Sequence, residues 1–155
     1  LHLSIRRQRQ MCIRDSLTPV ASPGFLKAHG AVIHEAGDCL GYPLLHDGDR
    51  ADWQLWLKAH GVADDMRAER GSAFDDDFLL IRAAEAGQGL ALVPQAYAQE
   101  EIAAGRLIQV LDKPWPARFA YYAVTRPGAA DRPEVRAFLD WIREEAEKKL
   151  SPSQP

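Results

Sequence analysis

The chain of 155 residues has few cysteines, no excess of basic residues and no long apolar run. Cys12 and Cys39 show neither the spacing of a metal site nor a disulfide framework, so we expect free thiols and a cytoplasmic location. The formal net charge of -3 argues against a basic nucleic-acid surface. No apolar stretch approaches the roughly 20 residues that a membrane-spanning helix needs. The sequence therefore predicts a globular protein without membrane association or direct nucleic-acid binding.

Motifs for catalysis or cofactor binding are also missing. The five histidines are scattered, with no HExxH or CxxC spacing, and neither a GxSxG elbow nor a phosphate-binding glycine loop is present. The carboxylates Asp75, Asp76 and Asp77 could form an acid/base or metal site, but helix capping explains them without partners elsewhere. We therefore predict no catalytic residue, no metal, no cofactor and no enzymatic activity.

The clearest positive signal is the segment from Phe74 to Pro94. Its three aspartates precede an apolar run with helical spacing, and carboxylates at such a place accept the free N–H groups of a first helical turn. Gly87 predicts the end of that helix, and Leu90 to Val93 read as a short buried strand. Helix, glycine turn and strand form half of a βαβ unit, whose open ends are where such folds bind ligands.

Helices and strands alternate along the rest of the chain, which predicts an α/β protein with mostly parallel strands. A helix from Arg50 to His60, capped by Asp49, carries two tryptophans a turn apart. The other expected elements are strands at Leu17–Ala21, Pro43–Leu45, Met66–Ala73, Leu107–Leu111 and Phe119–Val124, a turn at His46–Asp49, and helices at Pro23–His29, Gln95–Ala104 and Arg132–Lys149. A stripe of Val135, Phe138, Leu139 and Ile142 marks the inward face of the last helix.

The first 16 residues do not match the rest. Four arginines crowd a segment with neither helical nor strand periodicity. One interpretation is a basic DNA-binding arm. We prefer the alternative that residues 1–16 are non-native or disordered, because RRQRQMCIRDS resembles a translation of sequencing-adapter DNA. Residues 150–155 are also expected to be a disordered tail.

The sequence from Leu17 onward resembles the effector-binding domain of LysR-type transcriptional regulators. The matching segments are LTPVASPGFL, PLLHDGDRADWQLWLKAHG, FDDDFLLIRAAEAGQGLALVP, AAGRLIQVLD, FAYYAVTRP and DRPEVRAFLDWIREE. The AGQGLALVP turn is typical of the whole family, whereas HDGDRADWQLWL is closer to the branch that includes the glycine-cleavage activator.

This resemblance implies a periplasmic-binding-protein type II-like domain of two α/β lobes. Residues 17–149 would be the effector-binding part. Within it, residues 22–114 would form a complete second lobe, and residues 118–149 would return to a first lobe that is mostly missing. The N-terminal DNA-binding domain would be missing too, so the sequence would be a fragment of a ligand-sensing regulator. The alternatives are a solute-binding protein of the same fold and an α/β enzyme.

The resemblance also implies an effector site and a dimer surface. In the family the turn after the second strand, the start of the central helix and the return strand face the cleft between the lobes. A helix N-terminus there favours an anion, whereas the aspartates favour a cationic or zwitterionic effector, with an amino-acid-like molecule as one option. The implied effector-binding residues are His46, Asp47, Gly48, Asp49, Phe74, Asp75, Asp76, Phe119 and Tyr121.

The tryptophan-containing helix is the expected homo-oligomer surface of the full-length protein. It has more apolar side chains than one inward face can hold, and exposed aromatic patches mark interfaces. We assign Trp53, Leu55 and Trp56 to this surface. The alternative is that both tryptophans belong to the core, as large aromatic residues usually do. Partners are thus a small-molecule effector, a second copy of the chain and, only through the missing domain, DNA.

Overall fold

The computed structural model describes the backbone of residues 8–150, and the side chains of residues 8–15, 119–121 and 147–150 lie outside the described part. The chain divides into two compact units. One consists of residues 16–115, close to the predicted lobe of residues 22–114, and the other combines residues 1–15 with residues 116–155.

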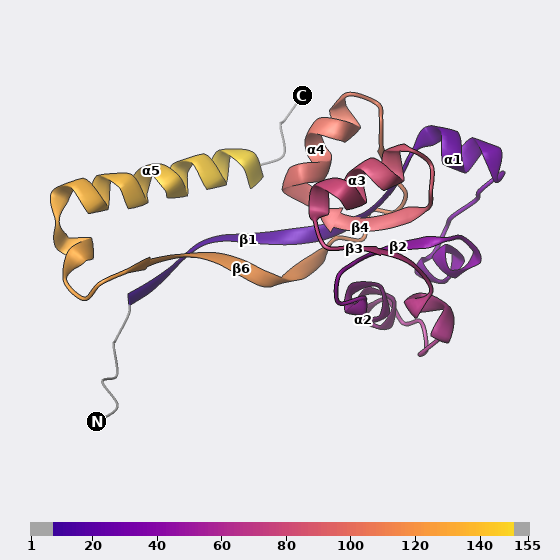
Figure 1. Ribbon diagram of the computed structural model, residues 1–155, viewed down its shortest axis with the longest axis horizontal. Coiled ribbons are helices and arrows are strands. Elements are labelled where there is room, and N and C mark those ends of the chain that lie inside the picture. The colour runs from indigo at the N-terminus through magenta and orange to yellow at the C-terminus, as the bar shows by residue number, and fades with distance from the viewer. Residues whose placement is uncertain (1–7, 151–155) are drawn as a thin grey trace. The chain divides into compact units, whose positions relative to one another are not determined.

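A sheet with helices on both faces forms the unit of residues 16–115 (Figure 1). Its strands lie in the order β3-β2-β4-β1-β5, with β2 parallel to β3 and β4, and β1 antiparallel to β4 and β5. The elements are β1 (Gln8–Ala21), of which residues 16–21 belong to this unit, α1 (Pro23–Ala28), the 3₁₀ helix η1 (Ala36–Gly41), β2 (Leu44–Asp47), α2 (Ala51–Ala59), the 3₁₀ helix η2 (Met66–Glu69), β3 (Gly71–Phe74), α3 (Asp77–Glu85), β4 (Leu90–Pro94), α4 (Gln95–Ala103) and β5 (Ile108–Gln109).

Two apolar cores fill the two faces of this sheet. Successive strand residues point to opposite faces, so Leu44 joins one core and Leu45 the other. The first core packs α1, η1 and α2 against the sheet, and the second packs α3 and α4 against the other face. All residues of β4 from Leu90 to Val93 are buried, as expected of a strand covered on both sides.

Short-range signals set most of the helix ends. The Ser22 hydroxyl accepts the Phe25 N–H and begins α1, with Pro23 as its first residue. The Asp76 carboxylate accepts the N–H groups of Phe78 and Leu79 and begins α3. Gly87, with φ of 75°, follows α3 and leads the chain into β4. These three predictions agree with the structure because a cap depends on residues only a few positions apart.

Three predictions about strands need correction. The strand expected at Met66–Ala73 is the 3₁₀ helix η2 followed by the short strand β3, because Asp65 caps residues 66–69 by accepting the Arg67 N–H. The sheet is mixed and not mostly parallel, since periodicity locates a strand but leaves its direction open. Residues 8–16, predicted to be non-native or disordered, are not disordered but form the first part of β1, and β1 pairs with β6.

The unit that contains the C-terminus comprises residues 8–15 of β1, β6 (Trp115–Thr125) from residue 116 onward, the 3₁₀ helix η3 (Ala129–Asp131) and α5 (Pro133–Leu150). Among the side chains of α5 that the structure describes, Leu139 and Ala146 are buried; they lie two turns apart on one face of the helix. The prediction that Phe138 lies on the inward face of this helix is wrong. Its side chain is 56% exposed, and its ring stacks on that of Trp141 with the ring centroids 5.9 Å apart.

Candidate functional site

A hollow of about 400 Å³ lies at the carboxyl ends of the neighbouring parallel strands β2 and β3. Asp47 and Phe74 are paired in the register of these strands, so the two chain segments that follow them leave the sheet side by side. The carboxyl edge of parallel strands is where open α/β folds bind ligands. The lining residues are Asp47, Gly48, Phe74, Asp75, Asp76 and Asp77.

The first wall of this pocket is the end of β2. A Cβ atom on Gly48 would lie 3.1 Å from the Asp75 Oδ1 atom, so the two walls approach each other closely at this glycine. His46 precedes the wall and is buried, and its Nε2 atom lies 2.9 Å from the carbonyl oxygen of Arg70. Burial lowers the pKa of His46, and the nearby positive charge of Arg50 adds to that effect. At neutral pH the imidazole is therefore uncharged, and in the tautomer protonated at Nε2 its Nε2–H group donates to the Arg70 carbonyl oxygen.

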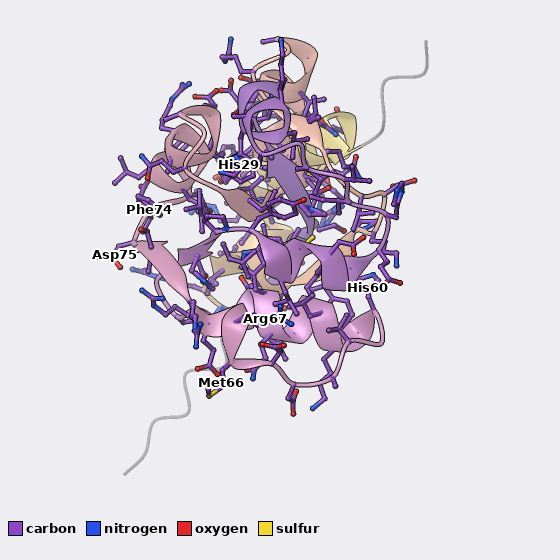
Figure 2. The ribbon with its side chains drawn as sticks, turned by 90° about the vertical axis from the view of Figure 1, so that its right-hand side faces the viewer. His29, His60, Met66, Arg67, Phe74 and Asp75 are labelled. Carbon is purple, nitrogen blue, oxygen red and sulfur yellow. The ribbon has the colours of Figure 1, made fainter. Side chains whose placement is uncertain are left out.

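The second wall is the end of β3 together with the first turn of α3. Phe74 and Asp75 project on the same side of the unit (Figure 2). Asp76 caps α3 and accepts two of its free N–H groups, at 2.8 Å from Phe78 and 3.2 Å from Leu79. Since those donors are already used, the helix N-terminus has little left to offer an anionic ligand.

The electrostatic character of the pocket follows from its lining. Four of the six lining residues are aspartates, and the lining includes no basic side chain among the residues that the structure describes. Carboxylates attract ammonium groups, and the ring of Phe74 adds an apolar wall. A small cation or a zwitterion with an accessible ammonium group fits this chemistry.

Five of the nine effector-binding residues predicted from the sequence line the pocket: Asp47, Gly48, Phe74, Asp75 and Asp76. His46 and Asp49 do not. His46 points into the fold toward Arg70, because alternation along β2 turns it away from the side of Asp47. The Asp49 Oδ1 atom accepts the Ala51 N–H at the start of α2.

One lining residue was missed, and two others cannot be placed. Asp77 lies in the first turn of α3, and its position next to Asp75 and Asp76 was the signal that could have identified it. Phe119 and Tyr121 are part of β6, but their side chains lie outside the described residues. Their contribution to effector binding stays a prediction.

The predicted dimer surface needs a correction. Trp53 and Trp56 are buried in the core, with ring centroids 5.6 Å apart, and their indole N–H groups donate to the carbonyl oxygens of Leu45 and Lys113. Both polar tips have partners inside the unit, so the rings belong to the core and cannot contact a second subunit. Leu55 points the other way and is 37% exposed.

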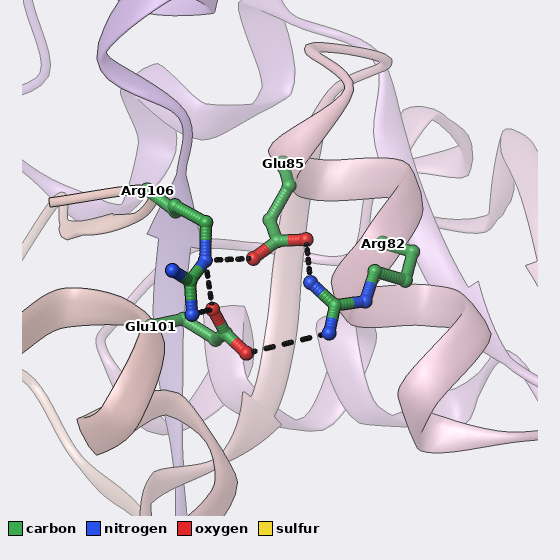
Figure 3. A network of polar contacts seen from close by, with 4 residues as sticks. All are labelled: Arg82, Glu85, Glu101 and Arg106. Carbon is green, nitrogen blue, oxygen red and sulfur yellow. Dashed lines mark hydrogen bonds and ion pairs between the residues drawn. The ribbon is translucent and has the colours of Figure 1, made fainter. Parts of the chain in front are cut away.

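A second polar cluster lies between α3, α4 and the turn before β5 (Figure 3). Arg106 pairs with Glu85 at 3.1 Å and with Glu101, while Arg82 pairs with both glutamates. The neighbouring carboxylates raise the pKa of the Arg106 guanidinium, with Glu101 the larger contributor. Each charge in this cluster faces an opposite charge, which indicates a structural role. We refer to Arg82, Glu85, Glu101 and Arg106 as the clamp.

Metal binding and thiol chemistry have little support in the described part of the chain. No group of three or more histidine, cysteine, aspartate or glutamate side chains there has the geometry to hold a metal ion. Cys39 is buried, and burial raises the pKa of its thiol to about 12, so it is inert as a nucleophile. None of the described helices is long and apolar enough to cross a membrane.

Comparison with protein families gives a match over most of the chain. The family described as LysR substrate binding domain matches residues 7–147. The match begins ten residues before Leu17, the first residue of the resemblance seen in the sequence. It thus includes the part of β1 for which the sequence predicts a non-native or disordered segment.

Comparison with curated proteins finds transcriptional regulators. The chain is 32% identical over 128 residues to the glycine cleavage system transcriptional activator of Escherichia coli, which covers 83% of this chain and 41% of that protein. It is 30% identical over 137 residues to the HTH-type transcriptional regulator TrpI of Pseudomonas aeruginosa, covering 84% of this chain and 44% of that protein. The chain therefore spans less than half the length of these relatives.

Comparison with solved structures finds the same architecture. The effector domain of the transcriptional regulator AmpR of Pseudomonas aeruginosa superposes with a TM-score of 0.71 at 23% identity, covering 94% of this chain and 70% of that one. The full-length virulence activator AphB of Vibrio cholerae gives a TM-score of 0.67 at 20% identity, covering 94% and 49%. At these identities the likeness concerns the fold.

Proposed function

The chain belongs to the LysR substrate-binding domain family, and from this membership we propose that it is the ligand-sensing part of a LysR-type transcriptional regulator. Its fold is the periplasmic-binding-protein type II-like fold of LysR effector domains. Its curated relatives are regulators and not enzymes, which favours a sensing role over the alternatives of a solute-binding protein and an α/β enzyme.

The pocket at the ends of β2 and β3 supports this function. It is a concave site at the edge of the sheet where ligands bind in related architectures, and its polar groups converge from two segments. Its four aspartates favour an effector with a free ammonium group, and a zwitterionic amino acid belongs to that class. The name of the glycine cleavage activator is consistent with an amino-acid-related effector.

The effect of the ligand would be a population shift. A ligand that contacts both walls of the pocket binds best to the arrangement in which the walls are closest, and it stabilises that arrangement by its differential affinity. DNA binding and self-association belong to the complete regulator, which acts in the cytoplasm as a homo-oligomer. The net charge of -3 gives this chain no general affinity for DNA of its own.

Titration of the chain with small molecules, followed by NMR, tests the proposal. We expect lysine, and more weakly glycine, to shift the amide signals of residues 47–48 and 74–77, whereas the dianion succinate leaves them unchanged. Asp75→Asn should weaken lysine binding by about tenfold, because it removes one charge partner from the pocket.

Asp64→Asn is the matched control, since this exposed aspartate lies outside the lining and pairs only loosely, at 3.9 Å, with Lys58. It should bind lysine as the wild type does. A preference for succinate, or shifts confined to residues outside the pocket, would contradict the proposed ligand class and site.

A further inference from the structure

Three successive backbone carbonyl groups, those of residues 69, 70 and 71, accept hydrogen bonds from two side chains that flank one wall of the pocket. The Arg50 Nη1 atom donates to the carbonyl oxygens of Glu69 at 3.0 Å and Gly71 at 2.9 Å. His46 contacts the carbonyl between them, that of Arg70, at 2.9 Å. In the sequence, the wall residues Asp47 and Gly48 stand between His46 and Arg50. The three carbonyl groups belong to the residues at and just before the start of β3, the strand that ends at the opposite wall.

The backbone of Arg50 is held in an unusual conformation. Its φ of 58° makes it the one non-glycine residue with positive φ in the part of the chain that the structure describes. A Cβ atom makes this left-handed conformation unfavourable, and glycine would adopt it without strain. Such strain persists where the surrounding structure enforces it, and it is concentrated at functional sites.

The left-handed turn directs the Arg50 guanidinium to the amino end of β3, the strand that leads to the opposite wall. The Arg50 N–H donates to the Asp47 carbonyl at 3.2 Å, which closes the turn behind the pocket wall, while the side chain reaches residues 19 and 21 positions further on. β3 is the last strand in the sheet order, so β2 is its neighbour within the described sheet. The Arg50 contacts thus add a second attachment between β3 and the end of β2.

We propose that Arg50 is a positioning residue of the pocket: its guanidinium fixes the distance between the wall at Asp47 and Gly48 and the wall at Phe74 to Asp77. This inference rests on the proposed function for the identity of the pocket as the effector site. Arg50 does not line the pocket and acts through the backbone carbonyls of Glu69 and Gly71. A guanidinium suits this role because its planar array of donors serves two acceptors at once.

Arg50→Gly in the full chain separates positioning from general stability. Glycine removes the guanidinium and also relieves the strained φ, so the thermal midpoint should change by no more than about 3 °C. Amide hydrogen exchange of residues 71–77 should nevertheless accelerate by about tenfold, the scale of one lost hydrogen bond from a charged donor. The affinity for lysine, measured by the same NMR titration, should fall by a similar factor because the walls are no longer held in register.

Two further variants complete the test. Arg50→Lys keeps the positive charge and offers an ammonium donor in place of the guanidinium, so it should restore part of the slow exchange and of the lysine affinity. Arg67→Ala removes the same charge from an exposed pair with Asp65 and should change neither. Faster exchange spread evenly over residues 16–115 in Arg50→Gly, or an Arg50→Lys variant no better than Arg50→Gly, would overturn the inference.

The two proposals fail in different ways. A wild-type chain that binds neither lysine nor glycine contradicts the proposed ligand class, and the exchange of residues 71–77 still decides the role of Arg50. Unchanged exchange in Arg50→Gly together with normal lysine binding by the wild type rejects the positioning role alone.

Discussion

His46 illustrates how one buried side chain connects the pocket to the stability of the fold. Its Nε2–H group holds the Arg70 carbonyl, while Nδ1 is buried with no hydrogen-bond partner among the described residues. Protonation would place a second donor and a positive charge at that buried position. Burial and the charge of Arg50 accordingly lower the pKa of His46 below its ordinary value of 6.5, against the opposing effect of the Arg70 hydrogen bond.

We expect His46 to destabilise the chain in mild acid. Well above pH 6.5 the side chain is neutral in both states, so it adds no pH dependence there. As the pH falls below 6.5 the unfolded chain takes up the proton first, and the free energy of unfolding decreases until the pH passes the lower pKa of the folded state. Urea unfolding at about pH 7.5 and about pH 5 measures the change.

His46→Gln is the comparison for this prediction, since a glutamine amide donates to the Arg70 carbonyl and does not titrate. All other titrating groups are the same in the two proteins, so the difference between their pH profiles reports His46. Parallel profiles for wild type and variant would show that His46 does not contribute.

At the scale of elements, the clamp of Arg82, Glu85, Glu101 and Arg106 connects two helices on one face of the sheet (Figure 3). Glu101 is almost completely buried, at 9% exposure, and it is the member that Arg106 approaches most closely. A buried carboxylate is stable only when charged donors satisfy it. The clamp thus depends on α3, α4 and the Arg106 turn being packed together.

Glu101→Gln should lower the thermal midpoint of the unit of residues 16–115 by about 4–8 °C. This is the shift expected when a unit of that size loses roughly 1 kcal/mol of stability. The neutral amide gives up the charge and turns one donor group toward the arginines, which are themselves donors. Glu100→Gln is the matched control, because the neighbouring residue of α4 is exposed. Equal melting temperatures for the two variants would mean that the clamp contributes no stability.

At the scale of the whole molecule, the edge of the sheet at β3 and the outer side of α2 form the self-association surface that we predict. β3 ends the strand order, and its residues Gly71, Ser72 and Ala73 are exposed. Leu55 is 37% exposed on α2, and Met66, on the 3₁₀ helix that packs against α2, is 75% exposed. An unpaired strand edge beside exposed apolar side chains is suited to contact a second copy.

Leu55→Glu in the complete regulator should lower its oligomeric state while its circular dichroism spectrum stays unchanged. In a symmetric interface one substitution acts in both subunits, and each introduces a charge where an apolar contact is needed. Sedimentation velocity measures the mass. Ile108→Glu is the control, since Ile108 is also 37% exposed but lies on β5 at the other end of the strand order. An unchanged mass for Leu55→Glu would exclude this surface.

The features that the sequence determined by itself are those that depend on neighbours within a few residues. The Ser22 and Asp76 caps, the turn at Gly87 and the buried strand β4 follow from local hydrogen bonding and periodicity. The same reasoning located the helix start after Phe74, at an end of the βαβ unit where such folds bind ligands, whereas the resemblance to the family named Phe74, Asp75 and Asp76 themselves.

The tertiary structure decided what depends on residues distant in the sequence. The indole of Trp56 is a core side chain because its N–H meets the Lys113 carbonyl, 57 residues away, and helical periodicity contains no information about that partner. The side chain of His46 does not line the pocket because it contacts the Arg70 carbonyl. Arg50 connects the end of β2 to the start of β3 through the carbonyl groups of Glu69 and Gly71, 19 and 21 positions away in the sequence. Only packing selects such partners, since loop closure and burial act on the chain as a whole.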